Sequence, residues 1–154
     1  MIKHYHAFKR IKQDYCEPPP NLPDVCGFWY WGVPDSGKSH DARSHPNSYL
    51  KACNKWWDNY RGEDHVVIED LDNIHKCLGH HIKIWADKYA FPAEHKGTTI
   101  QIRPKAIHVT SNYSIQEIFG DDPTLVTAIS RRFRVKHYPT PYTGPRSKPG
   151  DIIT

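Results

Sequence analysis

Residues 25–39 read VCGFWYWGVPDSGKS, and the second half of this stretch fills every fixed position of the phosphate-binding loop pattern G-x-x-x-x-G-K-[ST]. The first half, residues 25–31, is apolar and aromatic, which predicts a buried strand. A strand, a glycine loop and a helix form the context that the pattern requires, because loop amides and a helix N-terminus direct partial positive charge at one anion. The alternative is a chance glycine turn, and the preceding strand argues against it.

The residues in and around this loop are candidates for binding a nucleotide. Lys38 would reach the outer phosphates, and the Ser39 hydroxyl would take one place on Mg²⁺. The full candidate set is Gly32, Pro34, Asp35, Ser36, Gly37, Lys38, Ser39 and His40.

Length and composition set broad limits. A chain of 154 residues fits one domain with a single core. A net charge of +4 permits a polyanionic partner without requiring one. No apolar run approaches a membrane span and no signal-peptide pattern begins at Met1, so we expect no membrane partner.

The cysteines and histidines give no strong metal signal. Cys16, Cys26, Cys53 and Cys77 form no C-x-x-C pair, and we expect reduced thiols in an intracellular protein. Eleven histidines are present, with clusters at residues 4–6 and 80–81. Neither cluster has a partner pair at zinc-finger spacing, so solvated or locally hydrogen-bonded histidines are the expected interpretation.

The two ends of the chain differ from its middle. Residues 2–15 space apolar side chains by three and four, which predicts a short amphipathic helix that needs a neighbour. Residues 17–24, EPPPNLPD, hold four prolines in eight positions and predict an extended linker that sets this helix apart. The tail, residues 139–154, is rich in proline and glycine and is expected to be irregular.

Between these ends, predicted strands alternate with predicted helices. The strands are residues 25–31, 48–51, 65–70, 106–110 and 133–138, and the helical segments are residues 38–43, 74–89, 114–119 and 123–130. Gly79 is expected to weaken or split the second helical segment. Residues 92–103 predict a hairpin that turns at Lys96 and Gly97. This order predicts an α/β fold with a central, mainly parallel, five-stranded sheet flanked by helices.

Polar side chains follow two of the predicted strands. Glu69 and Asp70 end one strand, and Asn112 follows another, so all three are expected at the edge of the sheet that carries the glycine loop. Carboxylates there could hold Mg²⁺ or accept a proton from water, and an amide could contact the γ-phosphate. Arg131 and Arg132 precede the last strand and could stabilise phosphoryl transfer in a neighbouring subunit. Each of these residues also has a structural alternative without a role in catalysis. The two carboxylates could cap a turn, Asn112 could belong to an ordinary turn, and the two arginines could be a solvated basic pair.

These residues together resemble the superfamily 3 helicase domain of replication initiator (Rep) proteins of circular single-stranded DNA viruses. The matching strings, in the family's order, are GVPDSGKS, NKWWDNYRGEDHVVIEDLD, DKYAFPAEHKGTTIQIRPK, IHVTSN and SRRFRV. The resemblance covers roughly residues 5–138. It implies an AAA+-like P-loop NTPase fold over residues 25–138, with residues 1–16 as the end of an oligomerisation segment.

The resemblance also implies a role for each matching residue. Lys38 and Ser39 would be the Walker A pair, and Glu69 and Asp70 the Walker B acids that hold Mg²⁺ together with Ser39. Family members often have two aspartates there, so which acid binds Mg²⁺ and which acts on water stays open. The remaining implied roles are those of sensor, arginine finger and DNA contact. Asn112 would be the sensor, and Arg132 is the better match to the arginine finger, with Arg131 as the second candidate. Lys96 and its neighbour His95 would contact DNA.

Such proteins are ring-forming ATPases, typically hexamers, that use ATP and Mg²⁺ to move along single-stranded DNA during rolling-circle replication. The resemblance therefore implies a homo-oligomeric ring with single-stranded DNA in its channel, in the host nucleus. Rep proteins normally carry a nicking endonuclease as well. The segment before the linker is too short to form one, so we expect no nuclease activity and expect the chain to be a portion of a longer protein.

Two other functions remain open at this point. One is a nucleotide-switched assembly or binding module with weak ATPase activity. The other is a small-molecule or nucleoside kinase with the same loop, which would need an acceptor pocket and an arginine-rich lid that the sequence does not show.

Overall fold

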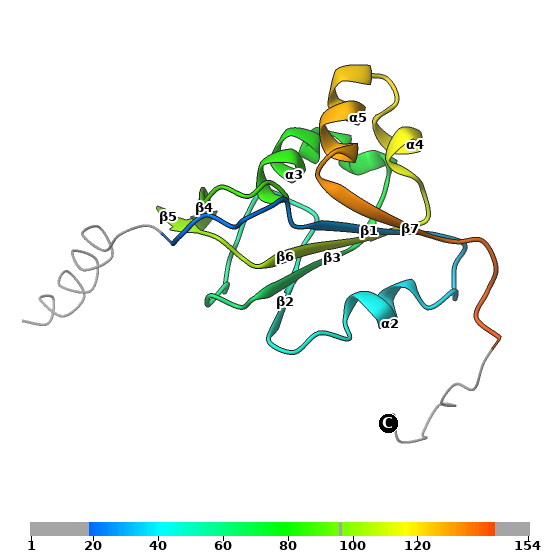
Figure 1. Cartoon of the computed structure of the whole chain (residues 1–154), viewed down its shortest axis with the longest axis horizontal. Helices are drawn as coiled ribbons and strands as arrows, with labels where there is room; N and C mark the ends of the chain where they lie inside the picture. The colour runs from blue at the N-terminus through cyan, green and yellow to red at the C-terminus, as the bar shows by residue number, and fades with distance from the viewer. Residues whose placement is uncertain (1–18, 96, 144–154) are drawn as a thin grey trace, which may run out of the picture.

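The computed structural model describes residues 19–95 and 97–143, which form a five-stranded sheet with helices on both faces and a separate hairpin (Figure 1). The strands of the large sheet are β1 (Gly27–Gly32), β2 (Ser48–Lys51), β3 (His65–Leu71), β6 (Ala106–Ser111) and β7 (Phe133–Tyr138). They lie in the order β2-β3-β6-β1-β7, and all four pairings are parallel. The predicted α/β fold with a mainly parallel five-stranded sheet is confirmed.

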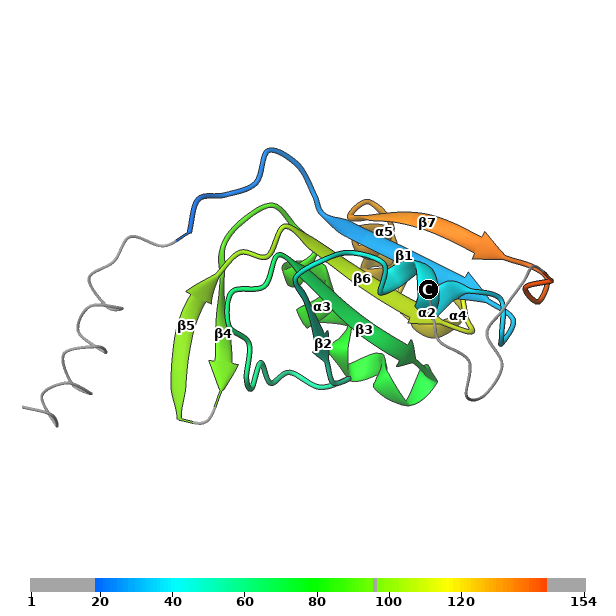
Figure 2. The same ribbon diagram turned by 90° about the horizontal axis from the view of Figure 1, so that it is seen from below.

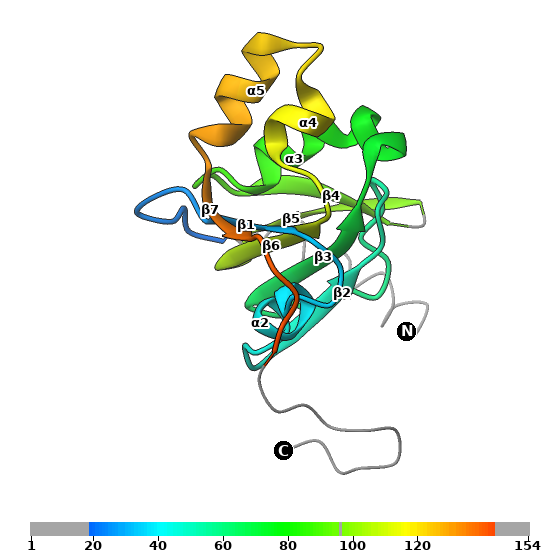
Figure 3. The ribbon, with the colours of Figure 1, turned by 90° about the vertical axis from the view of Figure 1, so that its right-hand side faces the viewer.

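Helices cover the two faces of this sheet unequally. The helices α3 (Gly79–Trp85), α4 (Ile115–Phe119) and α5 (Pro123–Ser130), with the 3₁₀ helix η1 (Asn73–Leu78), lie on one face, and α2 (Lys38–Ala42) lies on the other (Figure 3). The helical segment breaks at Gly79 as predicted. Gly79 is also a close packing point, because an added Cβ would lie 2.5 Å from Leu125 Cδ2. Within residues 19–95 and 97–143, none of the helices has the length and apolar character needed to cross a membrane.

The main core lies between the sheet and α3, α4 and α5. Successive strand residues face opposite sides, so Trp29 of β1 is fully buried in this core while Tyr30 packs in a smaller cluster on the α2 side. Ala42 and Val67 belong to the same smaller cluster. The Asp41 carboxylate anchors α2 to β7, since it accepts a hydrogen bond from the Tyr138 hydroxyl.

The parallel register brings several loops to one edge of the sheet. Trp31 at the end of β1 pairs with Ser111 of β6, and Ser111 in turn pairs with Leu71 of β3. The glycine loop, residues 32–39, therefore leaves the sheet beside the ends of β3 and β6. This register is the structural basis for bringing the predicted site residues together.

The hairpin and the linker lie at the other end of the molecule. The antiparallel strands β4 (Phe91–His95) and β5 (Thr98–Ile102) form the predicted hairpin, which extends away from the large sheet (Figure 2). Of the predicted linker, residues 19–24 are described, and they are held against the domain. Ala90 N donates to Asn21 Oδ1 at 3.0 Å, and Leu22 N donates to Lys88 O at 2.8 Å. The helix predicted for residues 2–15 lies outside the described residues.

Candidate nucleotide-binding site

The glycine loop has a backbone that needs glycine at both fixed positions of the motif. Gly32 has a φ of +148°, and an added Cβ would lie 2.0 Å from the carbonyl oxygen of Tyr138. Val33 N donates to that same oxygen at 3.2 Å, which ties the loop to the end of β7. Gly37 has a φ of +94° directly before α2. Conformation therefore accounts for these two glycines without reference to a ligand.

The Lys38 side chain folds back across the loop. Its ammonium donates to Val33 O at 2.7 Å and to Ser36 Oγ at 3.4 Å, and the residue is buried. Burial lowers the pKa of Lys38, while the charges of Asp70 and Asp35 act in the opposite direction. The loop thus holds a desolvated cation with an acidic residue of β3 in electrostatic range.

A β-bulge near the end of β3 sets the positions of the two acids. The pairing with β6 shifts register between Ile68 and Leu71, and Asp70 has a φ of +57°. Ile68 and Leu71 are three residues apart, so regular alternation would point them to opposite faces, yet both lie in the main core. Asp70 N donates to Thr110 Oγ1 at 3.1 Å and its side chain is exposed at the sheet edge. The bulge therefore keeps the core intact while it leaves the Asp70 carboxylate in solvent, within electrostatic range of Lys38.

Glu69 has a partner that the sequence did not indicate. Arg43, just after α2, donates from Nε and Nη2 to the two carboxylate oxygens of Glu69, each at 2.5 Å. Glu69 is largely buried and Arg43 is about half exposed. The only sequence signal was spacing, since Arg43 lies one helical turn after Ser39 and so on the same side of α2. Glu69 is thereby paired with a cation from the residue that directly follows α2.

Asn112 lies where it was predicted, directly after β6, and its side chain is exposed. The turn around it is fixed by Ser111, whose hydroxyl donates to Leu71 O at 2.6 Å and accepts from Tyr113 N at 3.0 Å. The structure therefore brings together the glycine loop, Glu69, Asp70 and Asn112. The other loop residues vary in exposure: Pro34, Asp35 and His40 are exposed, Gly37 and Ser39 are half-buried, and Gly32 and Ser36 are buried.

The chain beyond β7 also approaches the loop, which the sequence did not predict. Tyr142 N donates to Asp35 O at 2.8 Å, so residues 139–143 return past the glycine loop. The described part of the expected irregular tail is thus part of the surroundings of the site.

The two candidate arginines lie at the opposite edge of the sheet. Because β7 pairs with β1 from Phe133 at Gly27 to Tyr138 at Gly32, Arg131 and Arg132 are about 20 Å from the glycine loop of the same chain. Arg132 donates from Nε to Asp87 Oδ2 at 3.1 Å and from Nη1 to Ala128 O at 2.7 Å. Arg131 is exposed. Neither reaches the loop of its own chain.

The candidate DNA contacts belong to the hairpin. His95 is half-buried at the end of β4, and Lys96 lies outside the described residues. An open cavity of about 630 Å³ lies between the hairpin and residues 57–62, lined in part by His95, Tyr60 and Arg61. This cavity is separate from the glycine loop.

Comparison with known proteins gives one consistent group of relatives, although no protein family model matches the chain. The replication-associated protein of Porcine circovirus 1 is 33% identical over 114 residues, which is 67% of this chain and 33% of that protein. That of Goose circovirus is 36% identical over 90 residues, or 53% of this chain and 28% of that protein. That of Human associated cyclovirus 1 is 29% identical over 143 residues, or 88% of this chain and 50% of that protein. The chain thus spans between about a quarter and a half of the length of these relatives.

Proposed function

Because the chain is a homologue of the replication-associated proteins of circular single-stranded DNA viruses, we propose that residues 25–138 form an ATP-hydrolysing motor domain. It would be a P-loop NTPase of the superfamily 3 helicase type, acting on single-stranded DNA during rolling-circle replication. The observation that carries this proposal is the meeting of a G-x-x-x-x-G-K-S loop, two carboxylates and an amide at one edge of a parallel sheet.

The residues present fit Mg²⁺ and a nucleoside triphosphate. Gly32 leaves no room for a side chain against β7, and the loop that follows offers backbone amides and a buried lysine to an anion. The Ser39 hydroxyl and the carboxylates of Glu69 and Asp70 are oxygen ligands of the kind that Mg²⁺ prefers. When bound, the ion would neutralise charge that develops on the phosphates.

The chain's own side chains would perform the remaining work. Lys38 would exchange Val33 O and Ser36 Oγ for phosphate oxygens. One carboxylate of Glu69 or Asp70 would accept a proton from the attacking water, and Asn112 would orient that water or the terminal phosphate. In the described conformation Arg43 occupies both oxygens of Glu69, which favours a low rate of turnover in the isolated chain.

The same geometry supports a ring. Arg131 and Arg132 lie at the edge of the sheet opposite the glycine loop, so these two arginines could reach only the phosphates held by a neighbouring subunit. We propose a homo-oligomer, hexameric as the resemblance implies, with the hairpin residues His95 and Lys96 facing single-stranded DNA in the channel. A viral replication motor of this kind would act in the host nucleus.

ATP turnover by the full chain, with Mg²⁺ and with or without single-stranded DNA, tests the proposal. Lys38→Ala is expected to lower turnover by about 100-fold or more, because the group that neutralises the phosphates is lost. Lys105→Ala is the matched control, since Lys105 is exposed and pairs with Asp64 near the opposite edge of the sheet. Wild-type chain that forms oligomers and yet turns over no ATP would contradict the motor function.

The same assay separates the motor from the nucleotide-switched module. A motor is expected to respond to single-stranded DNA with faster turnover. A module would bind ATP with an affinity that depends on Lys38, turn it over slowly, and show no response to DNA.

A further inference from the structure

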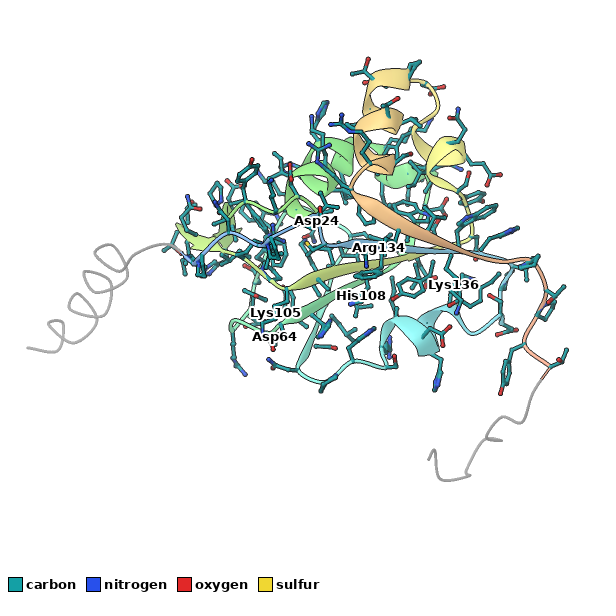
Figure 4. All side chains as sticks on the ribbon, in the orientation of Figure 1. Asp24, Asp64, Lys105, His108, Arg134 and Lys136 are labelled. Carbon is teal, nitrogen blue, oxygen red and sulfur yellow. The ribbon has the colours of Figure 1, made fainter. Side chains whose placement is uncertain are left out.

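Three histidines from three separate segments meet on the α2 side of the sheet. His45 lies in the loop after α2, His65 begins β3, and His108 lies in the middle of β6, on the side of the sheet that faces α2 (Figure 4). One ring nitrogen from each lies within 4.8 Å of those of the other two. None of these histidines belongs to the clusters that stood out in the sequence, because the chain separates them by about 20 and 40 residues.

Hydrogen bonds hold the ring nitrogens of the cluster, and one of them joins His65 Nδ1 and His108 Nε2. His108 Nε2 lies 3.0 Å from His65 Nδ1, close to the separation of roughly 3.3 Å expected for two nitrogens on one tetrahedral zinc ion. The other nitrogen of His108 lies 2.8 Å from the Tyr30 hydroxyl. His45 Nδ1 lies 3.3 Å from the carbonyl oxygen of Ala42. Histidines that bind a metal commonly donate their second N–H to such an oxygen.

The surroundings enclose the cluster on one side and leave it open on the other. Phe28 stacks on His108 with ring centroids 5.1 Å apart, and His108 is buried. His45 and His65 are half-buried, so solvent can reach the shared space.

Metal binding would require the His45 and His65 rings to turn. His45 stacks on His65 at 4.5 Å and on His108 at 4.3 Å, with interplanar angles of 22° and 25°. Nearly parallel rings do not aim their lone pairs at one point. The χ2 torsion of histidine is broad, however, so the half-buried His45 and His65 rings can turn toward the buried His108 without a change in the backbone.

We propose that His45, His65 and His108 bind a divalent transition-metal ion of the zinc type, with water in the fourth position. Three imidazoles suit zinc better than Mg²⁺ or Ca²⁺, which prefer oxygen ligands. The ion would connect the loop that follows α2 to strands β3 and β6. This metal site is independent of the proposed ATPase function, because none of its three ligands belongs to the glycine loop or to the carboxylates beside it.

Metal binding by the full-length chain tests this site without an activity assay. The apoprotein is titrated with Zn²⁺ in equilibrium dialysis, and with Co²⁺ while the visible absorption of tetrahedral cobalt is followed. We expect one tight site per chain. His65→Gln and His45→Gln should each weaken binding by about 100-fold or more, and Tyr30→Phe by about 10- to 100-fold through loss of the hydrogen bond to His108.

Matched controls separate this site from other histidines. His80→Gln with His81→Gln, and His4→Gln with His6→Gln, should leave the tight site unchanged. The half-buried His45 and His65 are the chosen positions because their loss leaves the core intact, and circular dichroism verifies the fold of each variant. Binding that survives in both the His45 and the His65 variant, or a wild-type chain that takes up no Zn²⁺ at micromolar concentration, would overturn the proposal.

Discussion

Arg43 shows how one side chain outside the loop motif can modify the site. Its guanidinium takes both oxygens of Glu69, so the chain without nucleotide has one fewer negative charge available beside Ser39 than its sequence suggests. A cation next to a Mg²⁺ site also opposes the ion directly. The residue therefore bears on Mg²⁺ affinity without being a predicted ligand.

Replacement of Arg43 by glutamine should strengthen Mg²⁺ binding in the nucleotide complex. We expect the Mg²⁺ concentration at half-maximal ATP turnover to fall by about three- to tenfold at low salt, because the repulsion between the guanidinium and the ion is removed. The effect is no larger because solvent screens this repulsion in the wild type. Arg61→Gln is the control, since Arg61 is an exposed arginine of the distant cavity wall. An unchanged or raised Mg²⁺ requirement in the Arg43 variant would show that Arg43 does not oppose the ion.

Lys51 is a second side chain that only the structure made visible. It is 4% exposed, and its ammonium lies 4.5 Å from the Trp85 ring and 5.1 Å from the Trp57 ring. It donates to the carbonyl oxygens of Ala52 and Asn54. Burial lowers the pKa of Lys51 to about 8.

This shift predicts a pH-dependent contribution to stability. Between pH 8 and about 10.4 the unfolded chain holds a proton that the folded chain has released, so the free energy of unfolding should rise with pH. From pH 7.5 to 9.5 the wild type should gain about 2 kcal/mol relative to Lys51→Met in urea unfolding. The difference between the two chains removes the contributions of other titrating groups. A difference that stays constant with pH would show that Lys51 titrates normally in the folded chain.

Among the elements, β3 has the most consequence for the site. Its residues predict a plain strand that ends in two acids, and the strand is indeed present. The β-bulge at Glu69 and Asp70 cannot be seen in the sequence of β3. It depends on the pairing of β3 with β6 and on the hydrogen bond from Asp70 N to Thr110. The helix break at Gly79 was predictable by contrast, since glycine weakens a helix locally.

Thr110→Val tests the bulge. Valine has nearly the same shape but cannot accept the hydrogen bond from Asp70 N, so we expect a loss of about 1 kcal/mol in the free energy of unfolding and a clear drop in ATP turnover. Thr110→Ser keeps the hydroxyl and should retain most of the turnover. Equal turnover in the valine variant and the wild type would mean that the bulge holds Asp70 without this contact.

For the whole molecule, the main consequence of the fold is the distance between the loop and the paired arginines. They lie at opposite edges of one parallel sheet, so a complete site requires a second subunit if Arg131 or Arg132 takes part. Arg132 is held by Asp87 in an ion pair, and the two side chains are 17% and 23% exposed. Arg131 is exposed and is the better placed of the two to contact a neighbour.

Mixtures of inactive variants test this arrangement. We expect Arg131→Ala and Lys38→Ala each to lose turnover, and an equimolar mixture to regain part of it, because some interfaces would pair an intact loop with an intact arginine.

Arg132→Ala should lower the free energy of unfolding by about 1–2 kcal/mol, since Asp87 is left without its ion-pair partner. Recovery in a mixture with Arg132→Ala but not with Arg131→Ala would instead assign the role to Arg132.

Local pattern was enough for most of the fold and for the candidates in the glycine loop and at the strand ends, while the DNA contacts His95 and Lys96 came from the family resemblance. The alternation of strands and helices, the glycine loop and the acids at the end of a strand are all properties of short stretches, and hydrophobic periodicity and glycine geometry act over a few residues. The strands were placed to within one or two residues, and the hairpin and the division at Gly79 appear where they were predicted.

Contacts between distant segments decided the rest. Sequence alone could not reveal that Arg43 pairs with Glu69, that Lys51 lies between two tryptophans, or that histidines of β3, β6 and the loop after α2 meet. Each of these depends on the strand order β2-β3-β6-β1-β7, which places non-consecutive strands side by side. The burial of these side chains and the distances between their charged groups follow from that order. A pattern within a short stretch of sequence predicts neither.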